Sequence, residues 1–88
     1  DIREVFARNL RKARNARCLS QEALAHEADV DRTYVSALER GVYNATIVMV
    51  AKLAKALGVE PSELFAEGQS QKRENANPFN VEPVVQQN

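Results

Sequence analysis

A short segment of the chain carries hydrogen-bond donors at the spacing of one helix face. Between Asp31 and Gly41, Val35 and Leu38 recur at a helical interval and are expected to point inward. An arginine on the opposite side could donate to O6 and N7 of guanine, hydroxyls could bond to bases or phosphates, and a small alanine could touch a thymine methyl. We therefore predict base readout in the major groove of DNA by Arg32, Thr33, Ser36 and Ala37.

A second group of residues is suited to the phosphate backbone. Ser20 and Gln21 begin a helical stretch, where free backbone N–H groups and the positive end of the helix dipole favour an anion. Gln21 is expected to clamp a phosphate with its side chain. Such contacts add affinity and fix the register of the protein without reading the base sequence. The predicted phosphate contacts are Arg17, Ser20, Gln21, Arg40, Tyr43 and Asn44.

The overall charge gives no direct sign of nucleic-acid binding. The sequence has 12 Lys and Arg and 12 Asp and Glu, with a formal net charge of +0. These charges are unevenly placed. The charged residues within 1–17 are mostly basic, whereas those within 60–67 are all acidic. One end of the domain can therefore approach phosphates. The basic run has two interpretations, a solvated helix face or a set of phosphate contacts.

The periodicity of apolar residues predicts five helices that position these side chains. They cover about residues 2–16, 21–28, 32–40, 47–57 and a short stretch from Pro61. Ser20, Asp31 and Thr46 are expected N-caps, and a glycine ends the third and the fourth helix. No strand-like alternation occurs in residues 1–67, so the predicted fold class is all-α. The inward face of the fourth helix is predicted to consist of Ile47, Val50, Ala51, Leu53, Ala54 and Leu57.

The length of 88 residues leaves room for one hydrophobic core. We expect a helix-turn-helix domain over residues 1–67 and a flexible C-terminal tail over residues 68–88, which lack a helical period and are rich in Asn and Gln. Alternatively, the tail docks on a partner protein. No window is apolar enough to span a membrane. Cys18, the single cysteine, is expected to be a packing residue in a reducing cytoplasm and to hold no structural zinc.

Three blocks of sequence resemble the lambda-repressor-like Xre/Cro family of helix-turn-helix proteins. They are LSQEALA at 19–25, VSALERG at 35–41 and LAKALGV at 53–59, and the resemblance extends over about residues 2–66. It implies a five-helix domain that binds a near-palindromic operator in double-stranded DNA as a homodimer. It also implies that Gln21 contacts a phosphate and that the first two turns of the third helix read the bases.

The same resemblance implies a structural ion pair and shows two departures from the family. Arg14 and Glu39 stand where family members pair the first and third helices, although an ordinary surface pair is the alternative. Asn44-Ala45 replaces the common Asn-Pro, so the loop before the fourth helix is expected to be softer. Apolar residues replace polar ones outside the core, and they are either scattered exposed residues or a candidate dimer surface made of Val48, Met49 and Ala56.

These features predict a sequence-specific DNA-binding transcriptional regulator of bacterial or phage origin, in the first place a repressor, that is cytoplasmic and associated with the nucleoid when bound to DNA. One alternative is an antitoxin or restriction-modification controller whose tail binds a protein. Another is a protein-interaction module without DNA binding. We expect no enzyme and no cofactor, because the sequence contains no nucleophile with a base, no phosphate-binding loop and no metal cluster.

Overall fold

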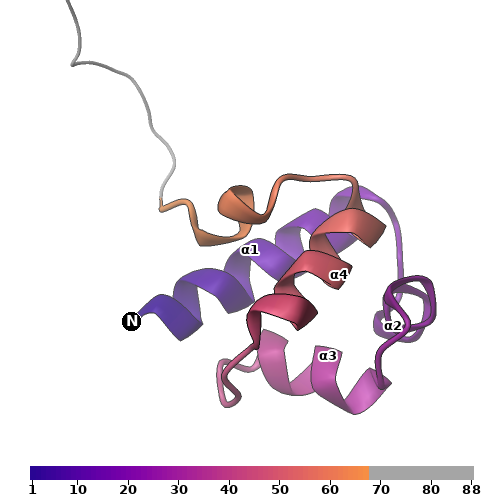
Figure 1. Cartoon of the computed structure of the whole chain (residues 1–88), viewed down its shortest axis with the longest axis horizontal. Coiled ribbons are helices and arrows are strands. Elements are labelled where there is room, and N and C mark those ends of the chain that lie inside the picture. The colour runs from indigo at the N-terminus through magenta and orange to yellow at the C-terminus, as the bar shows by residue number, and fades with distance from the viewer. Residues whose placement is uncertain (68–88) are drawn as a thin grey trace, which may run out of the picture.

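The computed structural model describes residues 1–67. Four α-helices follow one another as α1 (Ile2–Ala16), α2 (Gln21–Ala28), α3 (Arg32–Glu39) and α4 (Ile47–Leu57), and a 3-10 helix, η1 (Pro61–Phe65), completes the domain (Figure 1). The described residues contain no strand, so the all-helical class is confirmed. The proposed tail, residues 68–88, lies outside the described residues.

The fifth predicted helix is a single short 3-10 segment instead of an α-helix. It has only five residues, and 3-10 helices occur mainly as short segments of this kind, at helix ends and in connections. The Glu63 side chain accepts a hydrogen bond of 2.9 Å from the backbone N–H of Glu60 and so fixes its start. Asn9 of α1 donates to the carbonyl groups of Leu64 at 3.1 Å and Ala66 at 2.7 Å. These two bonds attach the end of the segment to α1.

Side-chain caps set where the helices begin, as the sequence predicts. The Ser20 hydroxyl accepts from the backbone N–H of Ala23, and the Thr46 hydroxyl accepts from that of Met49, both at 3.0 Å. Each bond satisfies a donor that has no partner within its own helix. After α1 the chain turns through Cys18 with a φ of 57°, a left-handed conformation that glycine adopts more easily. Cys18 is exposed, which does not fit the expectation that it is a packing residue.

One hydrophobic core joins all five elements. Its fully buried side chains are spaced along the helices at three- and four-residue intervals, which brings them onto one face of each helix. They include Leu10, Leu24, Val35, Leu38, Leu53 and Leu64. Helix α3 contacts α1 and α2, whereas α4 contacts α2 and η1. Within residues 1–67, α3 therefore packs against the core through the side that carries Val35 and Leu38.

The predicted inward face of α4 is partly wrong. Val50, Leu53, Ala54 and Leu57 are buried, but Ile47 is 87% exposed and Ala51 is also exposed. Ile47 and Ala51 stand one turn apart at the edge of the buried stripe. The contacts of α4 with α2 and η1 leave this edge of the helix exposed to solvent. No helix within residues 1–67 combines the length and the apolar character needed to cross a membrane.

Candidate nucleic-acid interface

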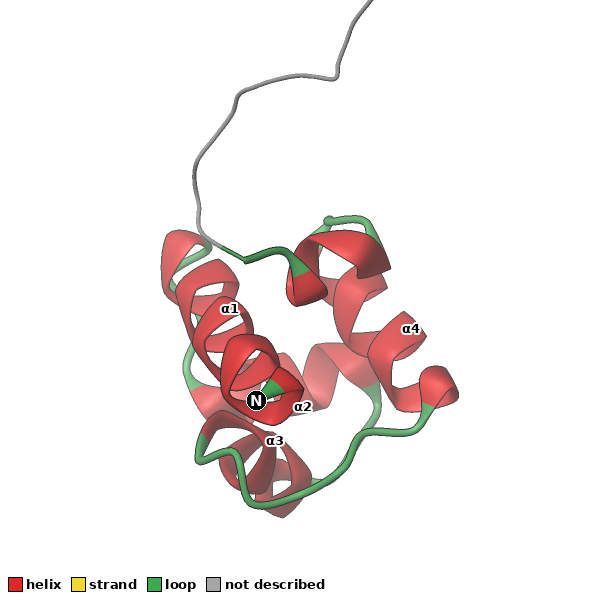
Figure 2. Ribbon diagram, turned by 90° about the vertical axis from the view of Figure 1, so that its left-hand side faces the viewer, coloured by secondary structure: helices red, strands yellow, loops and turns green. Residues whose placement is uncertain are grey.

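Helix α3 forms an outer side of the molecule. It runs along the lower edge in Figure 1 and stays at the lower edge when the molecule is turned by 90° in Figure 2. Val35 and Leu38 are 0% and 1% exposed and anchor the helix. Of the predicted base-reading residues, Arg32 and Thr33 are exposed, whereas Ser36 and Ala37 are half-buried. The first turn of α3 is thus the part that a duplex reaches most easily.

Asp31 holds the start of α3 in place. Its carboxylate accepts a hydrogen bond from the backbone N–H of Thr33 at 2.8 Å and another from the Thr33 hydroxyl at 2.7 Å. These two bonds lower the pKa of Asp31 from its ordinary value of 3.8, the hydroxyl contributing more than the backbone. The Thr33 hydroxyl thus has a partner within the protein, and its oxygen keeps lone pairs that can accept a hydrogen bond.

The lowered pKa of Asp31 makes the cap sensitive to acid. A carboxylate with a depressed folded-state pKa stabilises the fold above its unfolded pKa, and this contribution is lost as the pH falls through the folded value. Replacing Thr33 by alanine removes the stronger bond, so the pKa of Asp31 is expected to rise toward 3.8. Titration of the Asp31 side chain by NMR measures this change. Ser36→Ala serves as the control and should leave the Asp31 titration unaltered, and a midpoint unmoved in Thr33→Ala would contradict this account.

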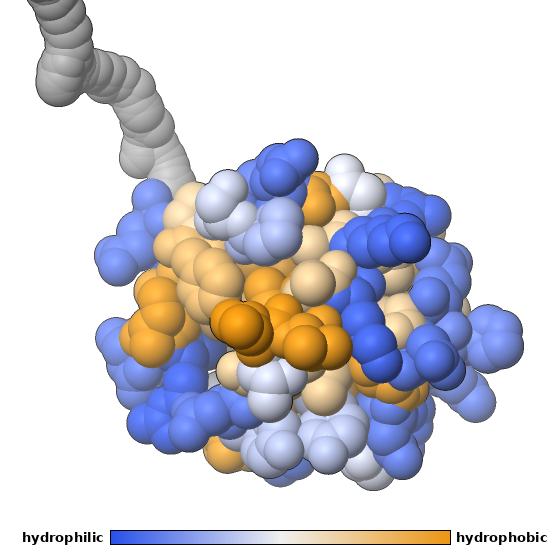
Figure 3. Space-filling model, in the orientation of Figure 1, coloured by the Kyte–Doolittle hydropathy of each residue, from blue (hydrophilic) through white to orange (hydrophobic). Residues whose placement is uncertain are grey.

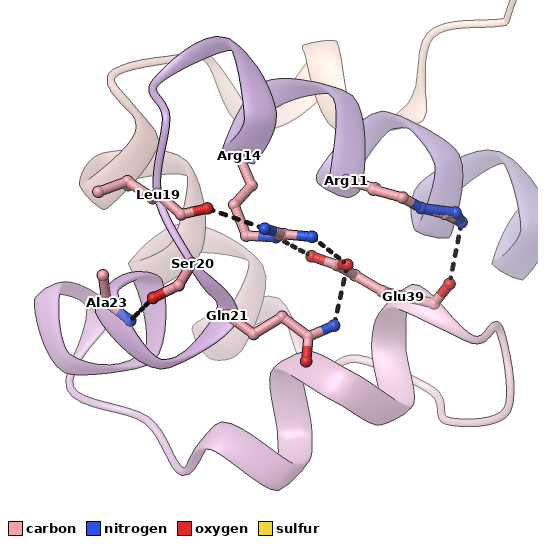
Figure 4. Close-up of polar contacts among 7 residues, drawn as sticks. All are labelled: Arg11, Arg14, Leu19, Ser20, Gln21, Ala23 and Glu39. Atoms are coloured by element: carbon pink, nitrogen blue, oxygen red, sulfur yellow. Dashed lines mark hydrogen bonds and ion pairs between the residues drawn. The ribbon is translucent and has the colours of Figure 1, made fainter.

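Arg14 and Glu39 connect α1 with the end of α3. The guanidinium donates from Nε to Oε2 at 2.6 Å and from Nη2 to Oε1 at 2.9 Å, which is a two-point contact (Figure 4). The Glu39 side chain is 5% exposed and that of Arg14 is 14% exposed. This hydrogen bonding raises the pKa of Arg14. The Nη1 group of Arg14 also donates to the carbonyl of Leu19 at 2.8 Å, just before α2 begins.

Gln21, the predicted phosphate clamp, belongs to the same network. It is the first residue of α2, and its Nε2 donates to Oε1 of Glu39 at 3.1 Å. Figure 4 shows the Gln21 carboxamide reaching from the start of α2 toward the Glu39 carboxylate, with its oxygen turned away from that group. An amide nitrogen has two hydrogens, so one remains for a further acceptor. Sequence reasoning paired Arg14 with Glu39 but missed this third member.

Two further residues have defined places near the network. The Ser20 hydroxyl caps α2 as an acceptor, which leaves its own hydrogen free to bond to a phosphate. The Nε of Arg40 donates to the carbonyl of Ser36 at 3.4 Å, and its side chain is exposed at the end of α3. Both side chains are therefore accessible for the phosphate contacts predicted for Ser20 and Arg40.

Arg17 is engaged elsewhere. Its Nη1 donates at 2.5 Å to the carbonyl of Ala56, near the end of α4, and lies 3.9 Å from the carboxylate of Glu27. A cation beside the last carbonyls of a helix is favoured by the helix dipole. The structure thus gives Arg17 a link between the end of α1 and the end of α4, away from the Gln21 network. Its phosphate contact stays a prediction.

The loop between α3 and α4 lies against α3 through an aromatic pair. The ring centroids of Tyr34 and Tyr43 are 5.2 Å apart, a distance typical of stabilising aromatic contacts. Hydrogen bonding with Tyr34 raises the pKa of the exposed Tyr43 phenol. Asn44, beside it, is exposed. Tyr34 was assigned no role from the sequence. Its position beside the outward face of α3 could have indicated that it packs against the following loop.

The candidate dimer surface divides into exposed and half-buried parts. Val48 is 63% exposed, whereas Met49 and Ala56 pack partly against the core. Ile47 joins Val48 as an exposed apolar side chain at the start of α4. In Figure 3 apolar side chains gather on the face of the molecule over α4. Within residues 1–67, no group of three or more His, Cys, Asp or Glu side chains is placed to hold a metal ion.

Comparisons with known proteins identify the family to which the chain is similar. A family model described as Helix-turn-helix, HTH_3, matches residues 10–64. Control protein C.BamHI of Bacillus amyloliquefaciens is 43% identical over 66 residues, which cover 74% of this chain and 82% of that protein. Control protein C.MunI of Mycoplasma sp is 41% identical over 68 residues, which cover 76% of this chain and 92% of that protein.

A solved structure shows the same fold. The restriction-modification controller protein C.AhdI from Aeromonas hydrophila is similar with a TM-score of 0.70 and 48% identity, over 72% of this chain and 96% of that one. The family resemblance predicted from the sequence is thereby confirmed. With the match over residues 10–64 and relatives above 40% identity, the chain belongs to the HTH_3 family of helix-turn-helix proteins.

Proposed function

We propose that this protein is a sequence-specific DNA-binding transcriptional regulator that inserts α3 into the major groove of double-stranded DNA. The observation that carries the proposal is the two-sided character of α3. Val35 and Leu38 fix the helix to the core, while Arg32 and Thr33 extend from an outer side of the molecule. The major groove of B-DNA admits one α-helix, whose first residues then meet the base edges.

Within this role, base and phosphate contacts have separate tasks. Arg32, Thr33, Ser36 and Ala37 are proposed to read bases. Gln21 and Ser20 at the start of α2, together with Arg40, Tyr43 and Asn44, are proposed to hold the backbone and fix the register. Most of the affinity is expected from the backbone contacts, so binding should weaken steeply as the salt concentration rises.

Among the regulators that the sequence allows, a restriction-modification controller is favoured over an antitoxin. Support comes from the relatives, since C.BamHI and C.MunI are named control proteins and C.AhdI is a restriction-modification controller protein. A regulator of this kind acts on DNA in the bacterial cytoplasm, and we expect repression as its main effect. Binding of a partner protein through residues 68–88 stays a prediction.

The base-reading role is tested by comparing two alanine variants on an operator selected from random duplexes. Arg32→Ala should cost about 1–3 kcal/mol of binding free energy on the preferred operator and relax the preference at one base pair. Gln21→Ala should weaken binding to every duplex by a similar factor. Fluorescence anisotropy on matched and mismatched duplexes distinguishes the two patterns. Selection that enriches no sequence would instead support an interaction module without DNA binding.

We also propose that two copies bind together, with the start of α4 in their interface. A near-palindromic operator requires two recognition helices related by a two-fold axis. The exposed branched side chains of Ile47 and Val48, continuous with the half-buried Met49 and Ala56, provide an apolar surface that a second copy would cover.

Val48→Asp should convert the dimer into a monomer, because a charge would be buried against apolar atoms. Sedimentation equilibrium measures this change directly. Asn15→Asp adds the same charge at an exposed position of α1 and should leave the dimer intact. A wild-type protein that stays monomeric at every concentration would refute the dimer, and a dimer that tolerates Val48→Asp would place the interface elsewhere.

A further inference from the structure

Glu39 makes more contacts than a link between two helices requires. Its carboxylate receives two hydrogen bonds from Arg14 and a third from the Gln21 side chain, and its backbone carbonyl receives one from Arg11 at 3.2 Å (Figure 4). Two of these donors lie on α1 and one at the start of α2. The Arg14 contact alone would suffice to join α1 with α3. The contact between Gln21 and Glu39 is therefore not explained by the connection of α1 with α3.

We infer that Glu39 is a positioning residue for DNA binding, because it holds the Gln21 carboxamide in the orientation that receives a phosphate. The inference rests on the proposed function, in which Gln21 contacts the backbone. Glu39 itself is 6% exposed and is not expected to touch DNA. It acts through Gln21, and Arg14 in turn fixes Glu39.

The physical basis is the conformational freedom of glutamine. A free glutamine side chain loses much rotamer entropy when it is fixed, and immobilising such a side chain on binding reduces affinity by about three- to tenfold. Here the bond of 3.1 Å from Nε2 to Glu39 already restricts the side chain in the free protein. One amide hydrogen is used by Glu39 and the other remains for a phosphate oxygen.

Because Glu39 is negatively charged, the inference predicts a change in DNA affinity opposite to the change that electrostatics alone predicts. A carboxylate close to a phosphate repels it, so removal of the negative charge would by itself strengthen binding to DNA. Arg14 offsets that repulsion with a two-point contact. If Glu39 positions Gln21, the variant Glu39→Gln should weaken binding although the protein has become more positive. A purely electrostatic role predicts tighter binding instead, and a purely structural role predicts the same loss whether or not Gln21 is present.

The experiment is a double-mutant cycle on the selected operator. Glu39→Gln should weaken binding about three- to tenfold when Gln21 is present, but should not change the Kd in the Gln21→Met background, where no amide remains to be oriented. All variants are measured below their unfolding transitions. Leu53→Val is the control for lost stability, because it changes the core without touching Gln21 and should leave the Kd unchanged.

A second measurement reports orientation without DNA. The side-chain amide of Gln21 should have a high NMR order parameter in the wild-type protein and a lower one in Glu39→Gln. Equal losses of affinity in both backgrounds, unchanged or tighter binding by Glu39→Gln, or a Gln21 amide equally mobile in both proteins would overturn the inference. If Gln21→Met alone leaves the Kd unchanged, the proposed phosphate contact fails and the inference fails with it.

Discussion

Glu39→Ala is expected to lower the free energy of unfolding by about 3 kcal/mol, since loss of one partner leaves the other charge of a buried pair uncompensated. The Arg14 side chain is only 14% exposed and directs two donors at the Glu39 carboxylate. For a domain of this size the melting temperature should fall by roughly 15 °C. Thermal and urea denaturation followed by circular dichroism measure both quantities.

Glu27→Ala is the matched control for this prediction. It also removes a glutamate that pairs with an arginine, but the Glu27 and Arg17 side chains are 42% and 45% exposed and their charged atoms lie 3.9 Å apart. Exposed pairs of this kind contribute roughly 0–1 kcal/mol. A comparable loss of stability in the two variants would mean that burial does not set the strength of the Arg14–Glu39 pair.

Leu53→Ala is expected to cost about 3 kcal/mol of stability, because it removes buried methyl groups and leaves a cavity in the core. Leu53 is 0% exposed and lies on α4 among the side chains that join all the helices. Denaturation by urea gives the free energy directly, and the midpoint should fall while the slope stays unchanged.

Ile47→Ala, on the same helix, is expected to have almost no effect on stability. Ile47 is 87% exposed in the single chain, so its truncation should change the stability of the monomer, measured at protein concentrations below dimerisation, by no more than about 0.5 kcal/mol. The two variants together test the orientation of α4. If Ile47→Ala were as damaging as Leu53→Ala, the helix would be rotated relative to the core.

The Arg14–Glu39–Gln21 network is expected to contribute both to the stability of the fold and to DNA binding. The same carboxylate that fixes α3 against α1 also holds the side chain proposed to contact a phosphate. A change at Glu39 is therefore expected to affect both folding and binding, whereas Leu53→Val should affect folding alone. This difference separates the two roles of the network in experiments on the same protein.

The sequence alone determined the helices and the family. Capping residues such as Ser20, Asp31 and Thr46, together with the apolar period, placed the starts of α2, α3 and α4 where the structure has them. These signals are local, because a cap bonds to a backbone group two or three residues away. The interval between Val35 and Leu38 also predicted the outward side of α3, on which Arg32 and Thr33 are exposed and Ser36 and Ala37 are half-buried.

The tertiary structure decided the contacts between residues far apart in the chain. In the structure Ile47 is exposed, Arg17 donates to the carbonyl of Ala56 and Gln21 donates to Glu39. None of these observations follows from helical periodicity. The reason is physical: periodicity fixes the direction of a side chain around its own helix, whereas its partner depends on how the helices cross. The sequence thus specified the helix whose residues are proposed to read DNA, and the packing of α1, α2 and α3 specified how that helix is held.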